Sequence, residues 1–217
     1  MWNREGKQIG QPFQGHQGDV NFVAISADGQ TIVSGGFDGT VRMWNREGKQ
    51  IGQPFQGHQG DVNFVAISAD GQTIVSGGFD GTVRMWNREG KQIGQPFQGH
   101  QGPVTSVAIS TDGRTIVSGG FDGTVRMWNR KGQQIGQPFR GYQSPPVTSV
   151  AISTDGQAIV SGGDDGTVRM WDIRLDTWLK VACERLRYHP ALRTPESNDE
   201  KEAKKTCEPY LRLVQKN

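Results

Sequence analysis

The chain has 217 residues, a formal net charge of +2 and 31 glycines, about twice the usual glycine content of ~7%, which disfavours a helical bundle. Because 24 Lys+Arg are nearly balanced by 22 Asp+Glu, no strong single-sign field exists to attract nucleic acid or an anionic membrane surface. No stretch approaches the ~18 apolar residues of a membrane span. We therefore expect no nucleic-acid partner and no membrane partner.

Internal repetition is the strongest signal in the sequence. Residues 1–42 recur without one change at 43–84, residues 85–126 differ from them at five positions, and 127–169 form a slightly longer fourth unit. A repeat of this length is typical of architectures in which each unit is one supersecondary element. We expect residues 1–173 to form a repeat domain. Glycine is absent from residues 174–217, which we expect to form a separate tail.

Within each unit, short apolar runs alternate with turn residues. In the first units these runs are 20–25, 31–33, 40–44 and 50–55, and Asp-Gly pairs such as Asp28-Gly29 and Asp38-Gly39 separate them. Asp-Gly supplies the positive φ that a tight hairpin needs, and β-branched residues suit strands. The pattern predicts four antiparallel strands per unit and no helix in the first 169 residues.

Gly15-His16, the stretch from Ser34 to Trp44 and the period of about 42 residues resemble the WD-repeat β-propellers. One departure is that Trp-Asn, as in Trp44-Asn45, ends the first three matching stretches, and Trp-Asp occurs only at Trp171-Asp172. The resemblance implies an all-β propeller of four-stranded antiparallel blades, with four blades in this chain and a small α-helical tail after them.

In this family, a His, a Ser or Thr, an Asp and a Trp of each blade form a buried hydrogen-bonded set. The matching residues are His16, Ser34, Asp38 and Trp44; His58, Ser76, Asp80 and Trp86; His100, Ser118, Asp122 and Trp128; and Tyr142, Ser161, Asp165 and Trp171. Buried imidazoles and carboxylates require polar partners. Because Tyr142 cannot replace both ring nitrogens of a histidine, we expect blade four to be held least tightly.

The same residue types also fit a Ser-His-Asp catalytic triad. Their recurrence in every unit, each with a tryptophan, favours a structural role. Catalysis also needs different groups that converge on one point, whereas identical blades repeat the same group. We therefore expect no enzyme, no catalytic residue and no cofactor. We expect no metal either, because the ring separates His16, His58 and His100.

A repeated surface suits binding better than catalysis. The candidate interaction face comprises Phe37, Phe79, Phe121, Asp164, Asn21 and Asn63. The three phenylalanines each precede an Asp-Gly turn. They either pack on the neighbouring blade or form a row of exposed aromatic anchors.

The tail contains two predicted helices. Asp176 can cap a helix that runs to about residue 188, and Ser197-Asn198-Asp199-Glu200 is a capping-box pattern for a second one. We expect Pro209 to kink or interrupt the second helix. The run from Trp178 to Arg187 resembles the tails of cyanobacterial WD-repeat proteins, some of which carry nucleotide-binding modules. No GxxxxGK[ST] phosphate loop occurs in this chain.

Cys183 and Cys207 are the two cysteines. On apolar helix faces they are expected to be small buried hydrophobes, with a redox pair or a metal site as the alternative. Two cysteines do not make a disulfide framework, and the N-terminus lacks the apolar core of a secretory signal. The expected location is the cytoplasm.

The function expected from this sequence is a noncatalytic protein–protein interaction scaffold that presents a repeated propeller face. The alternatives are a lectin-like propeller that binds small ligands, a hydrolase, or the recognition module of a larger NTPase-type signalling assembly.

Counting the strands predicts that the chain forms a homodimer by strand exchange. Each unit begins with the last strand of one blade, so the chain opens with a lone strand at 7–13 and blade four ends without its fourth strand. Two chains that exchange this strand would form an eight-bladed ring with about 45° per blade and two-fold symmetry. The alternative is a four-bladed monomer, whose blades would meet at about 90°.

Overall fold

The computed structural model describes residues 2–143, 146–174, 179, 183, 185, 186, 195 and 197–213. The chain forms two compact units, Met1–Met170 and Trp171–Asn217. The first unit consists of four antiparallel sheets, as the fold prediction requires, and we number these sheets as blades one to four in chain order.

Blades one and three have four strands, and blades two and four have three. Blade one contains β1 (Val20–Ile25), β2 (Thr31–Gly36), β3 (Val41–Asn45) and β4 (Gln50–Phe55); blade two contains β5 (Val62–Ile67), β6 (Thr73–Gly78) and β7 (Val83–Asn87); blade three contains β8 (Val104–Ile109), β9 (Thr115–Gly120), β10 (Val125–Asn129) and β11 (Gln134–Phe139); blade four contains β12 (Val147–Ile152), β13 (Ala158–Gly163) and β14 (Val168–Asp172).

Turn chemistry sets the boundaries of these strands. Gly39 follows Asp38 between β2 and β3 and has a φ of 71°, a conformation that glycine adopts at no steric cost. The Asp38 side chain accepts hydrogen bonds from the Thr40 backbone N–H and hydroxyl across the same turn. The turn therefore aligns β2 with β3, which pair from Thr31 with Asn45 to Gly35 with Val41.

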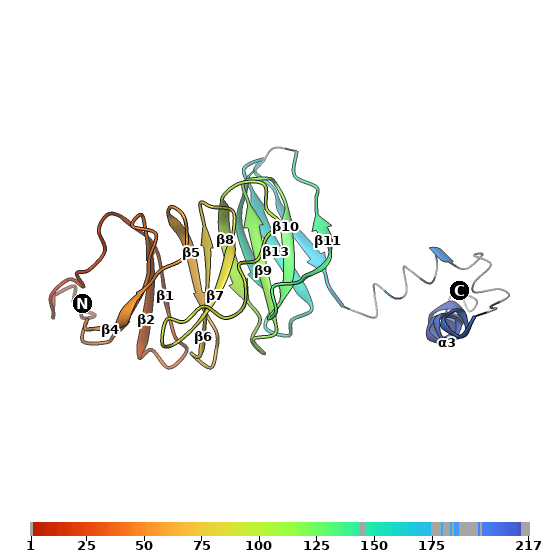
Figure 1. Cartoon of the computed structure of the whole chain (residues 1–217), viewed down its shortest axis with the longest axis horizontal. Coiled ribbons are helices and arrows are strands. Elements are labelled where there is room, and N and C mark those ends of the chain that lie inside the picture. The colour runs from red at the N-terminus through yellow and green to blue at the C-terminus, as the bar shows by residue number, and fades with distance from the viewer. Residues whose placement is uncertain are drawn as a thin grey trace. The chain divides into compact units, whose positions relative to one another are not determined.

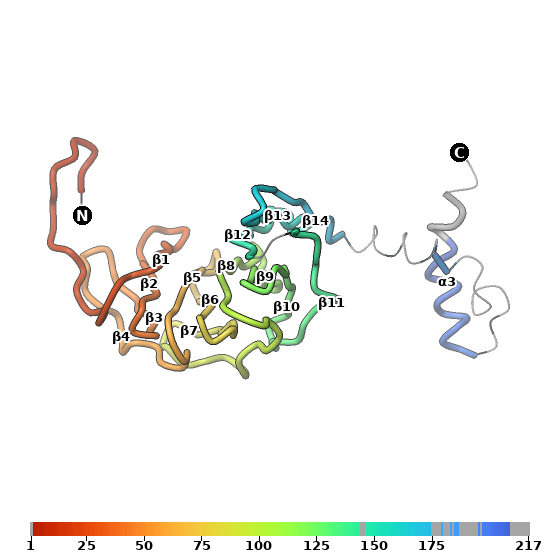
Figure 2. The backbone as a smooth tube through the Cα atoms, turned by 90° about the horizontal axis from the view of Figure 1, so that it is seen from above, coloured from red at the N-terminus to blue at the C-terminus, as the bar shows by residue number. Residues whose placement is uncertain are grey.

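The four blades follow one another along an arc (Figure 2). The strands β1, β5, β8 and β12 contact each other in that order. Apolar side chains of one blade pack against the next blade, as in the cluster that joins Val33, Val41 and Met43 of blade one to Val62 and Ile74 of blade two. The core therefore lies between the sheets, and each blade depends on its neighbours for burial.

The outer strand is regular in blades one and three but not in blades two and four. In blade two, residues 92–97 follow the path of a fourth strand through bridges of Trp86 with Gln92 and of Val83 with Phe97. In blade four, β14 pairs only with β13 among the described residues. The predicted lone strand at 7–13 is not formed, because no neighbouring strand pairs with it among the described residues, and only Gln8 makes an isolated bridge, with Trp2. This N-terminal segment lies at the opposite end of the arc from β14 (Figures 1 and 2). The four blades of the first unit thus form an open arc, which differs from the closed four-bladed monomer considered as the alternative.

The second unit contains helix α3 (Asn198–Leu213). The Glu200 backbone N–H donates to Ser197 Oγ, and the Ser197 N–H donates to the Glu200 carboxylate, so the predicted capping box is present. The helix continues through Pro209 instead of ending there, which corrects the predicted interruption. The first predicted tail helix, 176–188, falls mostly outside the described residues, of which 179, 183, 185 and 186 are helical.

Cys183 and Cys207 form a disulfide and are both buried. The cysteines are buried, as expected, but they are paired, which corresponds to the alternative of a redox pair. Spacing could not reveal the bond, because the two residues are 24 positions apart and only the fold of the tail brings them together. Since disulfides persist mainly in oxidising surroundings, cysteine usage no longer supports a cytoplasmic location.

Among the residues that the structure describes, no helix is long and apolar enough to cross a membrane.

Candidate functional site

The His–Ser–Asp–Trp sets predicted in blades one to three come together in the structure. In blade one, His16 Nε2 lies 2.7 Å from Ser34 Oγ, and His16 Nδ1 lies 3.0 Å from Asp38 Oδ1. The Trp44 indole N–H donates to Ser34 Oγ at 2.8 Å. Because the indole is a donor only, the serine hydroxyl proton points to His16 Nε2, and His16 Nδ1–H donates to Asp38. We call each such set a blade network.

Blades two and three repeat this geometry closely. The corresponding contacts join His58 to Ser76 at 2.7 Å and Asp80 at 3.1 Å, and His100 to Ser118 at 2.7 Å and Asp122 at 3.0 Å, with the Trp86 and Trp128 indoles on the two serines. Each blade network ties together the second and third strands of its blade, the turn between them and the loop that precedes the first strand.

The aspartate of each blade network has a pKa well below its ordinary value. Burial by itself would raise the pKa of Asp38, but the Gln17 backbone N–H, Thr40 and His16 donate hydrogen bonds that outweigh burial. For Asp80 and Asp122, burial is opposed first by the histidine and then by a backbone N–H. These aspartates are therefore charged at neutral pH and hold their donors in place.

Blade four departs from this arrangement at Tyr142. The Tyr142 hydroxyl lies 2.6 Å from Ser161 Oγ, and the Arg169 guanidinium carbon lies 4.8 Å from the centre of the tyrosine ring. Asp165 accepts hydrogen bonds from the Gln143 backbone N–H and from Thr167. Among the described residues no imidazole contacts Asp165, and the tyrosine makes one of the two contacts that histidine makes in the other blades. Trp171 lies near the end of β14.

The blade networks contain the residue types of a Ser-His-Asp catalytic triad, but their serines are not accessible to a substrate. Ser34, Ser76 and Ser118 are buried, and each hydroxyl is engaged by both an imidazole and an indole. A nucleophile must instead be free to approach a substrate. Their contacts favour a structural role. Among the described residues, no group of three or more His, Cys, Asp or Glu could hold a metal ion.

A row of aromatic side chains marks one face of the arc. Phe37, Phe79 and Phe121 are 51%, 59% and 56% exposed, and each sits at the turn between the second and third strands of its blade. Their backbone N–H groups donate to Asp19, Asp61 and Pro103 carbonyls, which fixes the turns. Asp164 takes the same position in blade four and is exposed. We call these four residues the repeat face.

Asn21 and Asn63 do not belong to the repeat face. The Asn21 side-chain amide donates to the Val62 carbonyl at 3.1 Å, and the Asn63 amide donates to the Val104 carbonyl at 3.0 Å. Both asparagines therefore join one blade to the next. This use removes them from the predicted interaction face.

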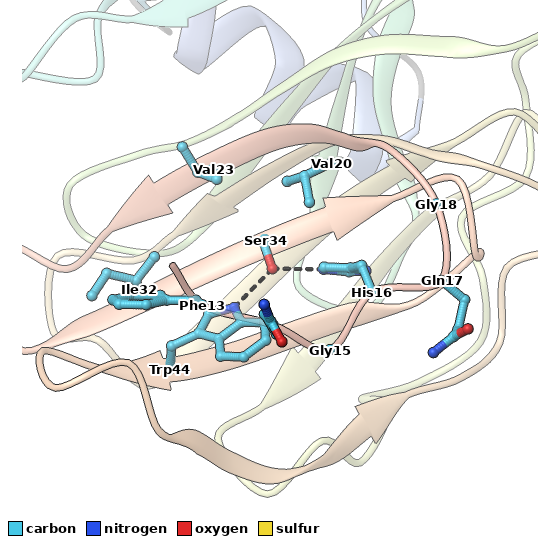
Figure 3. Close-up of a pocket in the computed structure, with 11 residues that line it drawn as sticks. Phe13, Gly15, His16, Gln17, Gly18, Val20, Val23, Ile32, Ser34 and Trp44 are labelled. Atoms are coloured by element: carbon cyan, nitrogen blue, oxygen red, sulfur yellow. Dashed lines mark hydrogen bonds between the residues drawn. The ribbon is translucent and has the colours of Figure 1, made fainter. Parts of the chain in front are cut away.

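A cavity of about 570 Å³ opens on the free side of blade one (Figure 3). Its lining includes Phe13, Val20, Val23 and Ile32 together with the His16, Ser34 and Trp44 side chains of the blade network. Sequence reasoning did not single out this cavity. The sequence did contain a signal for it. Units 1–42 and 43–84 are identical, but only the second has a blade before it, so the surface that the second unit buries against that blade is left exposed in the first.

Comparison with protein families supports the resemblance seen in the sequence. The model of the WD domain, G-beta repeat, called WD40, matches residues 6–45, 48–87, 90–129 and 132–172. Compared with the curated proteins, the chain has no match. The four matches cover most of the chain, and each ends with the third strand of one blade, so the chain belongs to the WD40 repeat family.

Proposed function

We propose that this protein is a noncatalytic scaffold that binds another protein on its repeat face. WD40 repeats generally mediate protein–protein interaction. The observation that supports this use of the repeat face is the half exposure of Phe37, Phe79 and Phe121 at equivalent turns. Exposed aromatic side chains on a rigid frame are typical anchors of protein interfaces.

The experiment is a comparison of two triple variants in affinity capture from the native cell. Replacing Phe37, Phe79 and Phe121 with serine should abolish the recovery of the partner. Replacing Lys49, Lys91 and Lys131 with alanine serves as the matched control, because these exposed residues lie in the turns at the opposite end of the third strands. Equal recovery by both triple variants would contradict the use of the repeat face.

A lectin-like propeller is the second candidate, and the cavity on blade one is the feature that favours it. Its volume lies within the range of small-molecule sites. A glycan array distinguishes the two functions, since reproducible sugar binding that a Val23→Lys substitution abolishes would support the lectin.

A role as the recognition module of a larger NTPase-type assembly requires a separate chain or segment for the nucleotide, because this sequence has no phosphate loop.

We also propose that the second partner is another copy of this chain, which supplies strand 7–13 to the open edge of β14. Among the described residues β14 pairs only with β13, and this supports the proposal, since the edge strand of a sheet favours the addition of another strand. A chain that lacks residues 1–13 should then aggregate or form open-ended oligomers. If the shortened chain has the same mass distribution as the full chain, strand exchange is wrong.

The cytoplasmic location stays a prediction from the sequence. Gel electrophoresis of alkylated protein from native cells tests it, because a reducing cytoplasm keeps Cys183 and Cys207 as thiols. The structure contains this disulfide, so recovery of the disulfide-bonded form from native cells would confirm the bond and contradict the cytoplasmic location.

A further inference from the structure

The first blade exposes an apolar surface that blade two, which has the same sequence, buries. Val23 is 60% exposed, whereas Val65, the same residue in the identical second unit, is 1% exposed; Val20 and Val62 differ in the same way. Because the two units have the same sequence, this exposure comes only from the lack of a preceding blade. The cavity at blade one is therefore the place that a neighbouring blade fills elsewhere in the arc.

The last blade presents the opposite surface. Val168 and Met170 on β14 are 76% and 75% exposed, whereas Val41 and Met43, at the same positions of blade one, are fully buried. In blade one, β4 and blade two cover these positions, through pairs such as Met43 with Ile51 and through the shared apolar cluster. Among the described residues, blade four has neither a fourth strand nor a following blade to cover Val168 and Met170.

The chain contains its own template for how these two surfaces fit. Between blades one and two, Val33, Val41 and Met43 pack in one cluster with Val62 and Val65, and the cluster also includes Ile74 and Trp86. Blades two and three repeat this cluster. The template places Val168 and Met170 of one chain against Val20 and Val23 of another, beside Ile32 and Trp44.

Polar contacts extend the same template. Asn21 donates to the Val62 carbonyl and Asn63 to the Val104 carbonyl, while the Thr105 hydroxyl of blade three donates to the Val147 carbonyl. In blade four, the exposed Thr148 hydroxyl reaches only as far as the Gly162 carbonyl of its own blade. The acceptor that the template assigns to Thr148 is the Val20 carbonyl of a second chain.

The N-terminal segment already lies where this arrangement needs a strand, although by itself it forms only an isolated bridge at Gln8. Phe13 and Trp44 have ring centres 5.8 Å apart, the same separation that joins Phe55 of β4 to Trp86 of the following blade. Phe55 also pairs with Val41 in the preceding blade. By this template, residues 8–13 bridge blade one of their own chain and β14 of the chain that docks on it.

We propose that the cavity of blade one is a socket for blade four of a second copy, which inserts Val168 and Met170 into it. This inference rests on the proposed dimer and specifies its geometry. The contact is head-to-tail, so each chain uses its first blade on one side and its last blade on the other. Two such contacts close a ring, whereas contacts that do not close would generate a filament.

Two single-charge variants test the head-to-tail geometry. Met170→Glu changes only the last blade, and Val23→Lys changes only the first blade; both side chains are exposed in the single chain, so the fold should survive, as circular dichroism can verify. Alone, each variant places an unpaired charge in both contacts of the ring and should weaken the dimer by about 100-fold or more.

An equimolar mixture of the two variants should restore the dimer, measured by light scattering. One contact then joins two unchanged surfaces, and the other places the introduced carboxylate of one chain opposite the introduced ammonium group of the other. Gln53→Glu, an exposed position on β4, adds the same charge elsewhere and should leave the mass unchanged.

The outcomes separate this inference from the proposed dimer. If the wild type is a dimer but Met170→Glu is also a dimer, or if mixing restores nothing, the dimer stands and the socket is wrong. If the wild type grows without limit and either variant stops that growth, the socket stands and the two-chain ring is wrong. A monomeric wild type contradicts both.

Discussion

At the scale of single residues, the blade networks explain how a glycine-rich chain keeps long loops in place. Each aspartate collects a backbone N–H, a threonine hydroxyl and an imidazole that belong to different segments of one blade. The histidine then links this group to a buried serine, which the tryptophan also contacts. Such fully satisfied polar groups specify one arrangement, because losing one partner leaves another group buried and unpaired.

The histidine of a blade network should therefore matter more than an average buried residue. His58→Ala removes the imidazole from both Ser76 and Asp80 and should lower the free energy of unfolding by about 1 to 3 kcal/mol. Tyr142→His should act in the opposite direction, because an imidazole can reach both Ser161 and Asp165. Thermal melting checks both variants, and three equal melting temperatures would show that the blade networks contribute nothing.

Acid should remove part of the stability that the aspartates provide. Their pKa values are lower in the folded chain than the ordinary value of 3.8, so the unfolded chain binds more protons around that pH. The stabilisation is complete above about pH 5 and is lost as the pH falls toward the folded pKa values. Asp80→Asn should flatten this loss relative to Asp19→Asn, an exposed control. Identical acid unfolding curves for the two variants would contradict this role for Asp80.

At the scale of blades, close packing between neighbours leaves no room for side chains at certain glycines. A Cβ atom on Gly77 would lie 2.5 Å from Val104 Cγ1 of the next blade, which is too close. At Gly162, the equivalent position in blade four, the nearest atom is Thr148 Oγ1 at 3.6 Å, an ordinary contact. A side chain is therefore excluded at this glycine position where a blade follows, as at Gly77, and tolerated where none is present, as at Gly162.

This difference gives a matched pair of alanine substitutions. Gly77→Ala should destabilise the folded chain by about 1 to 3 kcal/mol, because it overpacks an existing contact. Gly162→Ala should leave the isolated chain as stable as the wild type and raise the concentration at which dimers appear. Melting curves and the concentration dependence of the mass check the two effects. An unchanged dimer in Gly162→Ala would place that glycine outside any interface.

The fold of the blades was predictable because local signals agree with one another. Asp-Gly turns, β-branched runs and a repeated period point to the same strands four times, and the structure has the inner three strands of all four blades but the predicted outer strand only as β4 and β11. The relation of Asn21 to Val62 was not predictable in this way, since it depends on how one blade is rotated against the next. The disulfide and the continuation of α3 through Pro209 likewise depend on the fold of the tail, for which the sequence has no repeat to compare.

At the scale of the whole molecule, the central feature is an arc with two unlike ends. One end has a cavity beside Val20 and Val23, and the other has the exposed Val168 and Met170 on β14. The cavity could not be found from residue types, because it arises from a missing neighbour and not from a special sequence. A repeated chain shows the filled and unfilled versions of one surface together, and the filled version identifies what fits.

The mass of the intact protein in solution is the most direct test of this account. Light scattering at micromolar concentration should give about 48 kDa, twice the chain mass of 23.8 kDa, because two chains complete the ring. A mass that stays near 23.8 kDa across the micromolar range would contradict the account.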